Sequence, residues 1–96
     1  MKNKMEITMS AIQTLIDQTL SYAKQSHDNG SHEMAKCYME DWNEFLEIQY
    51  LISAGYIQAA GDRLDEMDTD PREQMVMVIL ADYDHDMLEK LGFALL

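Results

Sequence analysis

Turn-forming residues are scarce in this chain, and their scarcity constrains the fold more than any other feature. Only four glycines and one proline occur among 96 residues, which leaves little material for the frequent turns of a sheet protein. Apolar residues instead recur every three or four positions, as they do on one face of a helix. We therefore expect an all-α fold, in a single domain spanning residues 1–96, because a chain of this length leaves no room for two.

Two long helices are expected in the first half of the chain. The first runs from about residue 5 to residue 28, and Gly30 ends it, because glycine tolerates the left-handed conformation that closes many helices. Ser31 is a suitable N-cap for the second helix. The turn between them is short, so they should form an antiparallel helical hairpin. The facing apolar stripes hold Met5, Met9, Ile12, Ile16, Leu20 and Ala23 in the first helix and Ala35, Tyr38, Trp42, Phe45, Gln49 and Ile52 in the second.

The second half of the chain should add one short helix and one long helix. We expect a break at Gly55 and then a short helix through Met67. A single long helix passing through Gly55 is the alternative, because glycine costs only about 1 kcal/mol inside a helix. Asp70 and Pro71 fit the N-cap and the first position of a last helix that Gly92 closes. The expected fold is a compact bundle of three long helices plus one short helix.

Some side chains outside the main stripes bear on packing. Cys37 is expected to be a small buried side chain. Most of the nine methionines should fill the core, with Met34, Met75 and Met87 on inward faces. We also expect the chain to self-associate as a dimer, which would bury the apolar residues that lie off the stripes, namely Tyr22, Tyr50, Leu51 and Leu88.

The chain is strongly acidic. Eighteen Asp and Glu against seven Lys and Arg give a formal net charge of −11. Phosphate contacts need basic side chains, so direct binding to nucleic acid or to an anionic membrane is disfavoured. One cysteine cannot form a disulfide framework, and the spacing of His27, His32 and Cys37 matches no zinc signature, so we expect no cofactor and no metal. No apolar run approaches the ~20 residues of a membrane span, and the expected location is the cytoplasm.

Acidic side chains line one side of the predicted second helix, opposite its apolar stripe. The acidic side chains from Glu33 to Glu47 form a stripe about 21 Å long. Duplex DNA carries about twelve charges over that length. Four glutamates are too few to imitate that density, so other acids would have to join them. The stripe is either a solvated surface or a partner-binding face. The candidate residues of that face are Glu33, Glu40, Glu44, Glu47, Asp62, Asp65, Asp82, Asp84 and Asp86.

These features favour a non-enzymatic acidic protein-binding module. It would act as an inhibitor or adaptor that occludes a basic, nucleic-acid-binding surface of a partner protein. Small acidic inhibitors of restriction and CRISPR systems, carried by phages and plasmids, are similar to this chain in size and charge. The alternative is a structural or regulatory homodimer.

A second alternative is enzymatic. The motif Glu44-Phe45-Leu46-Glu47 is followed, after fourteen residues, by Asp62-Arg63-Leu64-Asp65. This pattern resembles the ExxE and ExxD motifs of the MazG-like nucleotide pyrophosphohydrolases, an all-α family in which neighbouring helices hold magnesium; Asp62 stands where the family has Glu. The resemblance implies magnesium-dependent nucleotide hydrolysis, with these four carboxylates as metal ligands. No catalytic residue is otherwise indicated, and we expect the chain not to be an enzyme.

Overall fold

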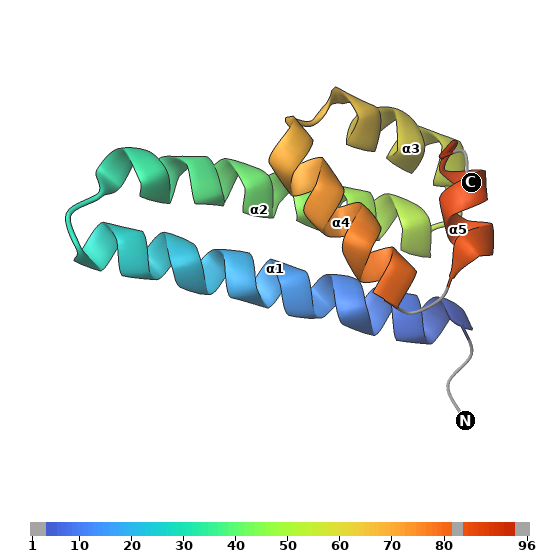
Figure 1. Cartoon of the computed structure of the whole chain (residues 1–96), viewed down its shortest axis with the longest axis horizontal. Helices are drawn as coiled ribbons and strands as arrows, with labels where there is room; N and C mark the ends of the chain where they lie inside the picture. Colours follow the sequence, from blue (N-terminus) through green and yellow to red (C-terminus); the bar gives the residue numbers. More distant parts are fainter. Residues whose placement is uncertain (1–3, 82–83, 94–96) are drawn as a thin grey trace.

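The part of the chain that the structure describes forms five α-helices. The computed structural model describes residues 4–81 and 84–93, with the side chains from residue 8 onward. The described residues contain no strand, so the all-α class is confirmed, whereas the expected set of three long helices plus one short helix is wrong. In chain order the helices are α1 (Lys4–Asp28), α2 (His32–Ser53), α3 (Ile57–Glu66), α4 (Thr69–Ala81) and α5 (His85–Lys90) (Figure 1).

Helices α1 and α2 form the predicted antiparallel hairpin (Figure 1). At the turn, Gly30 has a φ of 81°, and the Ser31 N–H donates to the Ser26 carbonyl at 2.8 Å. Ser31 occupies the N-cap position of α2, but its side chain makes no capping hydrogen bond. The sequence therefore predicted the position of the turn correctly, and the hydrogen bond that stabilises it comes from the backbone.

The predicted break at Gly55 is also confirmed. Gly55 has a φ of 89°, and the Tyr56 N–H donates to the Leu51 carbonyl at 2.8 Å, which closes α2 as Gly30 closes α1. Because α2 ends here, α3 can fold back and pack against it. The alternative of one long helix through this region is wrong.

The predicted last helix is interrupted, and this is the main difference from the expected fold. Helix α4 begins at Thr69, two residues before Pro71, and α5 begins only at His85. Asp84 is the N-cap of α5, since its carboxylate accepts a hydrogen bond from the Met87 N–H at 3.1 Å. The same carboxylate accepts a hydrogen bond from the Thr8 hydroxyl at 2.7 Å. Asp84, held by α1, therefore begins a new helix, although the apolar period that suggested one continuous helix runs on past it.

All five helices contribute to the core. Gly61 lies so close to the Leu91 backbone that a Cβ there would meet the Leu91 carbonyl carbon at 3.1 Å, so this glycine allows α3 to approach the end of α5. Met75 and Met87 are buried as predicted. The buried cluster comprises Ile12, Leu15, Ile16, Phe45, Ile48, Ile52, Ala60, Leu64, Met75, Ile79, Met87, Leu88 and Leu91.

Three expectations about burial are wrong. Leu88 lies off the predicted stripe but is fully buried, because α5 is a separate helix that turns it into the core. Met34 is 54% exposed, and Cys37 is also exposed. Both lie in the first part of α2, where α3, α4 and α5 do not cover the hairpin; those helices gather at the opposite end, beside the start of α1 (Figure 1). Tyr22 and Tyr50 are exposed, as their positions off the stripes predicted.

Candidate functional site

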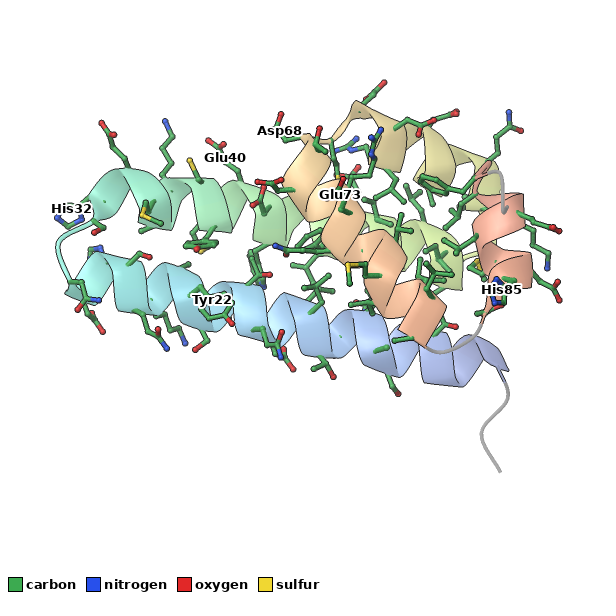
Figure 2. The ribbon with its side chains drawn as sticks, viewed as in Figure 1. Tyr22, His32, Glu40, Asp68, Glu73 and His85 are labelled. Carbon is green, nitrogen blue, oxygen red and sulfur yellow. The ribbon has the colours of Figure 1, made fainter. Side chains whose placement is uncertain are left out.

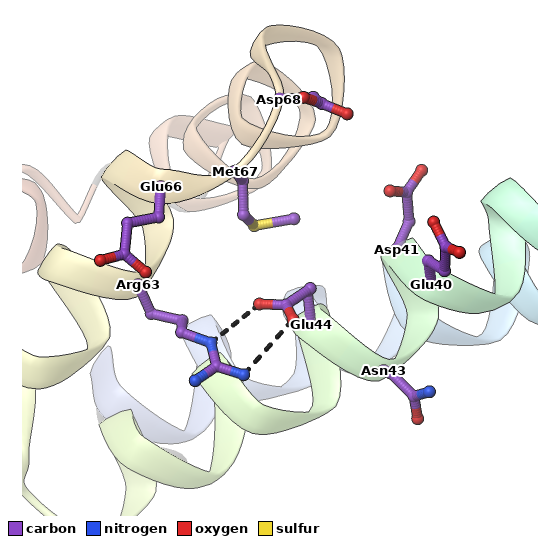
Figure 3. Close-up of a pocket in the computed structure, with 8 residues that line it drawn as sticks. All are labelled: Glu40, Asp41, Asn43, Glu44, Arg63, Glu66, Met67 and Asp68. Carbon is purple, nitrogen blue, oxygen red and sulfur yellow. Dashed lines mark hydrogen bonds and ion pairs between the residues drawn. The ribbon is translucent and has the colours of Figure 1, made fainter.

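A groove rich in acidic side chains lies between α2 and the junction of α3 with α4 (Figure 3). Two adjoining hollows form it, and both are bordered by Glu40, Asp41 and Asp68. We call this feature the acidic groove. The remaining residues that line it are Cys37, Tyr38, Asn43, Glu44, Arg63, Glu66, Met67, Thr69, Asp70, Pro71 and Gln74.

The position of the acidic groove follows from two local signals in the sequence. Gly55 ends α2 and lets α3 return along it, which places the end of α3 beside the middle of α2. Pro71 lies within the first turn of α4, where a proline costs little because the first N–H groups of a helix have no partner inside it. The chain therefore turns sharply at residues 67–68 and brings the acids of that turn opposite those of α2.

Negative charge dominates the groove. Six carboxylates line it, and Arg63 is the only lysine or arginine among the lining residues. The pKa of Asp41 is raised above its usual value, first by partial burial and then by repulsion from Asp68, Glu40 and Glu44. Burial alone raises a carboxyl pKa, and the three neighbouring carboxylates add to the shift because each disfavours the charged form of Asp41. A cationic group entering the groove would relieve this repulsion.

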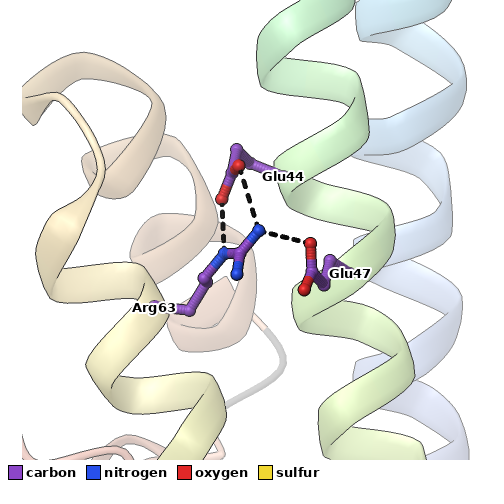
Figure 4. Close-up of polar contacts among 3 residues, drawn as sticks. All are labelled: Glu44, Glu47 and Arg63. Atoms are coloured by element: carbon purple, nitrogen blue, oxygen red, sulfur yellow. Dashed lines mark hydrogen bonds and ion pairs between the residues drawn. The ribbon is translucent and has the colours of Figure 1, made fainter.

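Arg63 partly offsets the charge at one end of the groove. Its Nε donates to Glu44 Oε2 at 2.9 Å and its Nη2 donates to Glu44 Oε1 at 3.3 Å (Figure 3). The same Nη2 also donates to Glu47 (Figure 4). The pKa of Arg63 is raised, chiefly by the hydrogen bond to Glu44, so the guanidinium stays charged. Arg63 thus links α3 to α2 and makes no ion pair with the other five lining carboxylates, which are Glu40, Asp41, Glu66, Asp68 and Asp70.

The predicted acidic face is only partly assembled by the fold. Glu40 and Glu44 line the acidic groove, and Glu47 is held by Arg63. Glu33 is exposed in the first turn of α2, near the hairpin turn, and Asp62, Asp65 and Asp86 are exposed on α3 and α5. None of these four lines the groove. Asp82 lies outside the described residues.

Asp84 was predicted to belong to the acidic face, and this prediction is wrong. It is 4% exposed, and its carboxylate accepts the hydrogen bonds from Thr8 and from the Met87 N–H. A buried, hydrogen-bonded carboxylate cannot contact a partner on the surface, so Asp84 is a structural residue and not part of an acidic face.

The sequence-based site missed four groove acids. The predicted face follows the stripe opposite the aromatic residues of α2, whereas the groove lies at the edge of that stripe and includes a loop. The run of acids across the turn between α3 and α4 was the available signal. The missed residues are Asp41, Glu66, Asp68 and Asp70.

The arrangement of the motifs that resemble the pyrophosphohydrolases differs from the expected metal site. A guanidinium, that of Arg63, contacts Glu44 and Glu47, while Asp62 and Asp65 are exposed on either side of it. In the part of the chain that the structure describes, no three or more His, Cys, Asp or Glu side chains are grouped so that they could hold a metal ion. The observed contacts therefore give the enzymatic alternative no support.

Comparison with known proteins identifies no relative. No protein-family model, no curated protein and no solved structure matches this chain. Within the described residues, none of the helices combines the length of a membrane span with the apolar character that one requires. The geometry and charge of the acidic groove are therefore the features of the molecule that bear on its function.

Proposed function

We propose that this chain is a non-enzymatic acidic binding module that uses the acidic groove to occlude a basic, nucleic-acid-binding surface of a partner protein. The observation that carries the proposal is the gathering of six carboxylates from α2, α3 and α4 around one groove that contains a single arginine. Surfaces that bind phosphates are rich in Lys and Arg, and such side chains complement this charge pattern.

The raised pKa of Asp41 supports the same interpretation. Asp68, Glu40 and Glu44 all act on Asp41, and they come from two different segments of the chain. Folding therefore partly buries Asp41 and brings Asp68 toward the acids of α2, and both changes disfavour the charged form of Asp41. A Lys or Arg side chain of a partner would make ion pairs there and offset this effect, so the repulsion adds to the affinity for a cationic partner.

The groove also offers apolar contacts for a docked basic segment. Met67 and Tyr38 are half-buried along its two hollows, and Pro71 is buried beside them. Lys and Arg side chains carry long apolar stems, which pack on such surfaces while the charged head meets the carboxylates. Two or more basic residues of a partner could engage the groove in this way.

The test compares the wild-type chain with two variants of equal net charge. The groove variant carries Asp41→Asn and Asp68→Asn, and the control carries Asp17→Asn and Glu89→Gln, at exposed positions away from the groove. Each is used to capture proteins from the lysate of the source cells at low and at moderate salt, followed by mass spectrometry. The captured protein is then assayed for binding to its own DNA or RNA with and without this chain.

We expect a nucleic-acid-binding protein to be captured at low salt and to lose its DNA or RNA when this chain is added. The groove variant should bind it about fivefold to tenfold more weakly, since exposed ion pairs contribute up to ~1 kcal/mol each. Equal weakening by the control would show that bulk charge matters and the groove does not. An interaction that does not change with salt, or a complex that still binds nucleic acid, would overturn the proposal.

A homodimer is the second candidate, and a separate observation favours it. At the uncovered end of the hairpin, α1 and α2 border a hollow whose apolar lining includes Leu20, Ala23, Ala35 and Met39. A second copy packed on this surface would bury it. Sedimentation of the purified chain over a range of concentrations tests this, and a monomer at every concentration would eliminate it.

A further inference from the structure

Two histidines meet at the end of the hairpin that the other helices leave uncovered. His27 lies in the last turn of α1, and His32 is the first residue of α2. Their imidazole ring centres are 5.1 Å apart, with an angle of 63° between the ring planes. Both side chains are exposed, and His32 lies at the very end of the molecule (Figure 2). The turn at Gly30 therefore brings together two groups whose sequence spacing matched no metal motif.

We propose that His27 and His32 together bind one divalent transition-metal ion of the Zn²⁺, Ni²⁺ or Cu²⁺ class. With metal–nitrogen bonds of about 2.0–2.1 Å and a tetrahedral angle, two imidazole rings on one ion have centres roughly 5 Å apart. The observed separation of 5.1 Å already fits this arrangement. Both side chains are exposed, so their rings are free to rotate and turn a nitrogen of each toward a shared ion.

The residues around the histidine pair determine how tightly it binds a metal ion. Lys24 and Lys36 border the same hollow as both histidines and disfavour a cation there, while Asp28 favours it. The described residues provide no third protein ligand in a suitable group, so the pair occupies two positions of the ion. Water, or the same pair of a second copy, fills the rest. This is the chemistry of an exchangeable site and differs from that of a closed structural zinc site.

Binding at this position would act on the stability of the hairpin end. The two ligands belong to different helices, so the ion bridges α1 and α2 across the turn. An ion that binds the folded hairpin and not the open one stabilises the folded form by mass action. The site thus serves as a clip where no packing from α3, α4 or α5 supports the hairpin.

The experiment titrates the full chain with ZnCl₂ and with NiCl₂, using calorimetry, thermal unfolding and the histidine ring signals in NMR. The variants are His27→Gln, His32→Gln and, as a matched control, His85→Gln, since His85 is the third histidine and is exposed on α5. The double variant Lys24→Gln and Lys36→Gln tests the electrostatics. All five substitutions lie at exposed positions, so each variant should fold.

We expect saturable binding that raises the unfolding temperature and shifts the ring signals of His27 and His32. Either glutamine substitution should weaken binding by about tenfold or more, because a second tethered ligand acts at a high effective concentration. The His85→Gln variant should bind normally, and the double lysine variant should bind more tightly. A doubled molecular mass at half an equivalent of metal also supports the site, as a pair shared between two copies. Binding that survives either substitution, or no binding of either metal, overturns the proposal.

Discussion

Thr8 and Asp84 lie 76 positions apart in the chain, yet the Thr8 hydroxyl donates a hydrogen bond of 2.7 Å to the Asp84 carboxylate. Both residues are buried, and Asp84 also accepts a hydrogen bond from the Met87 N–H. A single carboxylate therefore begins α5 and attaches it to α1. This contact closes the fold, because it joins helices from the two ends of the described chain.

Replacing Thr8 should lower the free energy of unfolding, because its hydroxyl bonds a carboxylate that lies outside α1. Thr8→Val keeps the shape of the side chain but leaves one oxygen of a buried carboxylate without its donor, and we expect a loss of about 1.5–3 kcal/mol. Thr14→Val is the control, because Thr14 is exposed on the same helix. Urea denaturation followed by circular dichroism measures both. Equal stability of the two variants would show that the contact contributes nothing.

Gly61→Ala should destabilise the chain although alanine is the better helix former. A Cβ at this position would collide with the Leu91 carbonyl, so α3 and α5 must separate, at a cost of about 1–3 kcal/mol. Ala59→Gly, at an exposed position of the same helix, should cost about 1 kcal/mol through helix propensity alone. Thermal unfolding of both variants distinguishes the two effects: if propensity decided the outcome at residue 61, the alanine variant would be the more stable one.

Asp41→Asn should stabilise the fold at neutral pH. The pKa of Asp41 is raised in the folded chain, so the folded state holds its proton more tightly than the unfolded state does. Stability is therefore lost as the pH rises through the raised pKa, and is regained when that carboxylate is removed. The difference in unfolding free energy between variant and wild type should grow from acid to neutral pH. A constant difference across this range contradicts the repulsion inferred for the groove.

The coupling free energy between Arg63 and Glu44 should depend on the salt concentration. The pair joins α3 to α2 through two hydrogen bonds, but both side chains are more than a third exposed, so the coupling should be small. A double-mutant cycle with Arg63→Gln and Glu44→Gln measures it. We expect a favourable coupling at low salt that shrinks as salt is added. A coupling that salt leaves unchanged would mean that the guanidinium acts through packing.

Cys37 should react with a thiol reagent in the folded protein. The side chain is exposed at the edge of the acidic groove, so no unfolding is needed for access. Addition of a chromogenic disulfide reagent without denaturant should modify one thiol per chain. A thiol that becomes reactive only in urea would place Cys37 in the interior, as the sequence suggested.

The hairpin and the break at Gly55 could be predicted because their causes are local. Gly30 and Gly55 each lie next to the helix that they end, and the apolar period of α1 and α2 is uninterrupted on either side. The division between α4 and α5 could not be predicted in the same way. Its cause is Asp84, whose partner Thr8 is remote in sequence, and the apolar period continues through the break because both helices face one core.

The candidate site shows the same contrast between local and remote causes. Glu40 and Glu44 could be predicted, because residues four apart share a face of a helix. Asp41 and Asp68 could not be paired from the sequence, since their proximity depends on how α3 returns along α2. The ion pair of Arg63 with Glu44 could not be predicted for the same reason. The approach of His27 to His32 could not be predicted either, because it depends on the geometry of the turn between α1 and α2.

The contact between Thr8 and Asp84 also has a consequence for synthesis on the ribosome. The α1–α2 hairpin can form as soon as its own residues have emerged, because the contacts between its two helices are local to this part of the chain. The buried face of that hairpin then waits for Met75, Ile79, Leu88 and Leu91, which are translated after it. Until these residues emerge, the nascent hairpin exposes an apolar surface, which favours aggregation when translation stops before they are made.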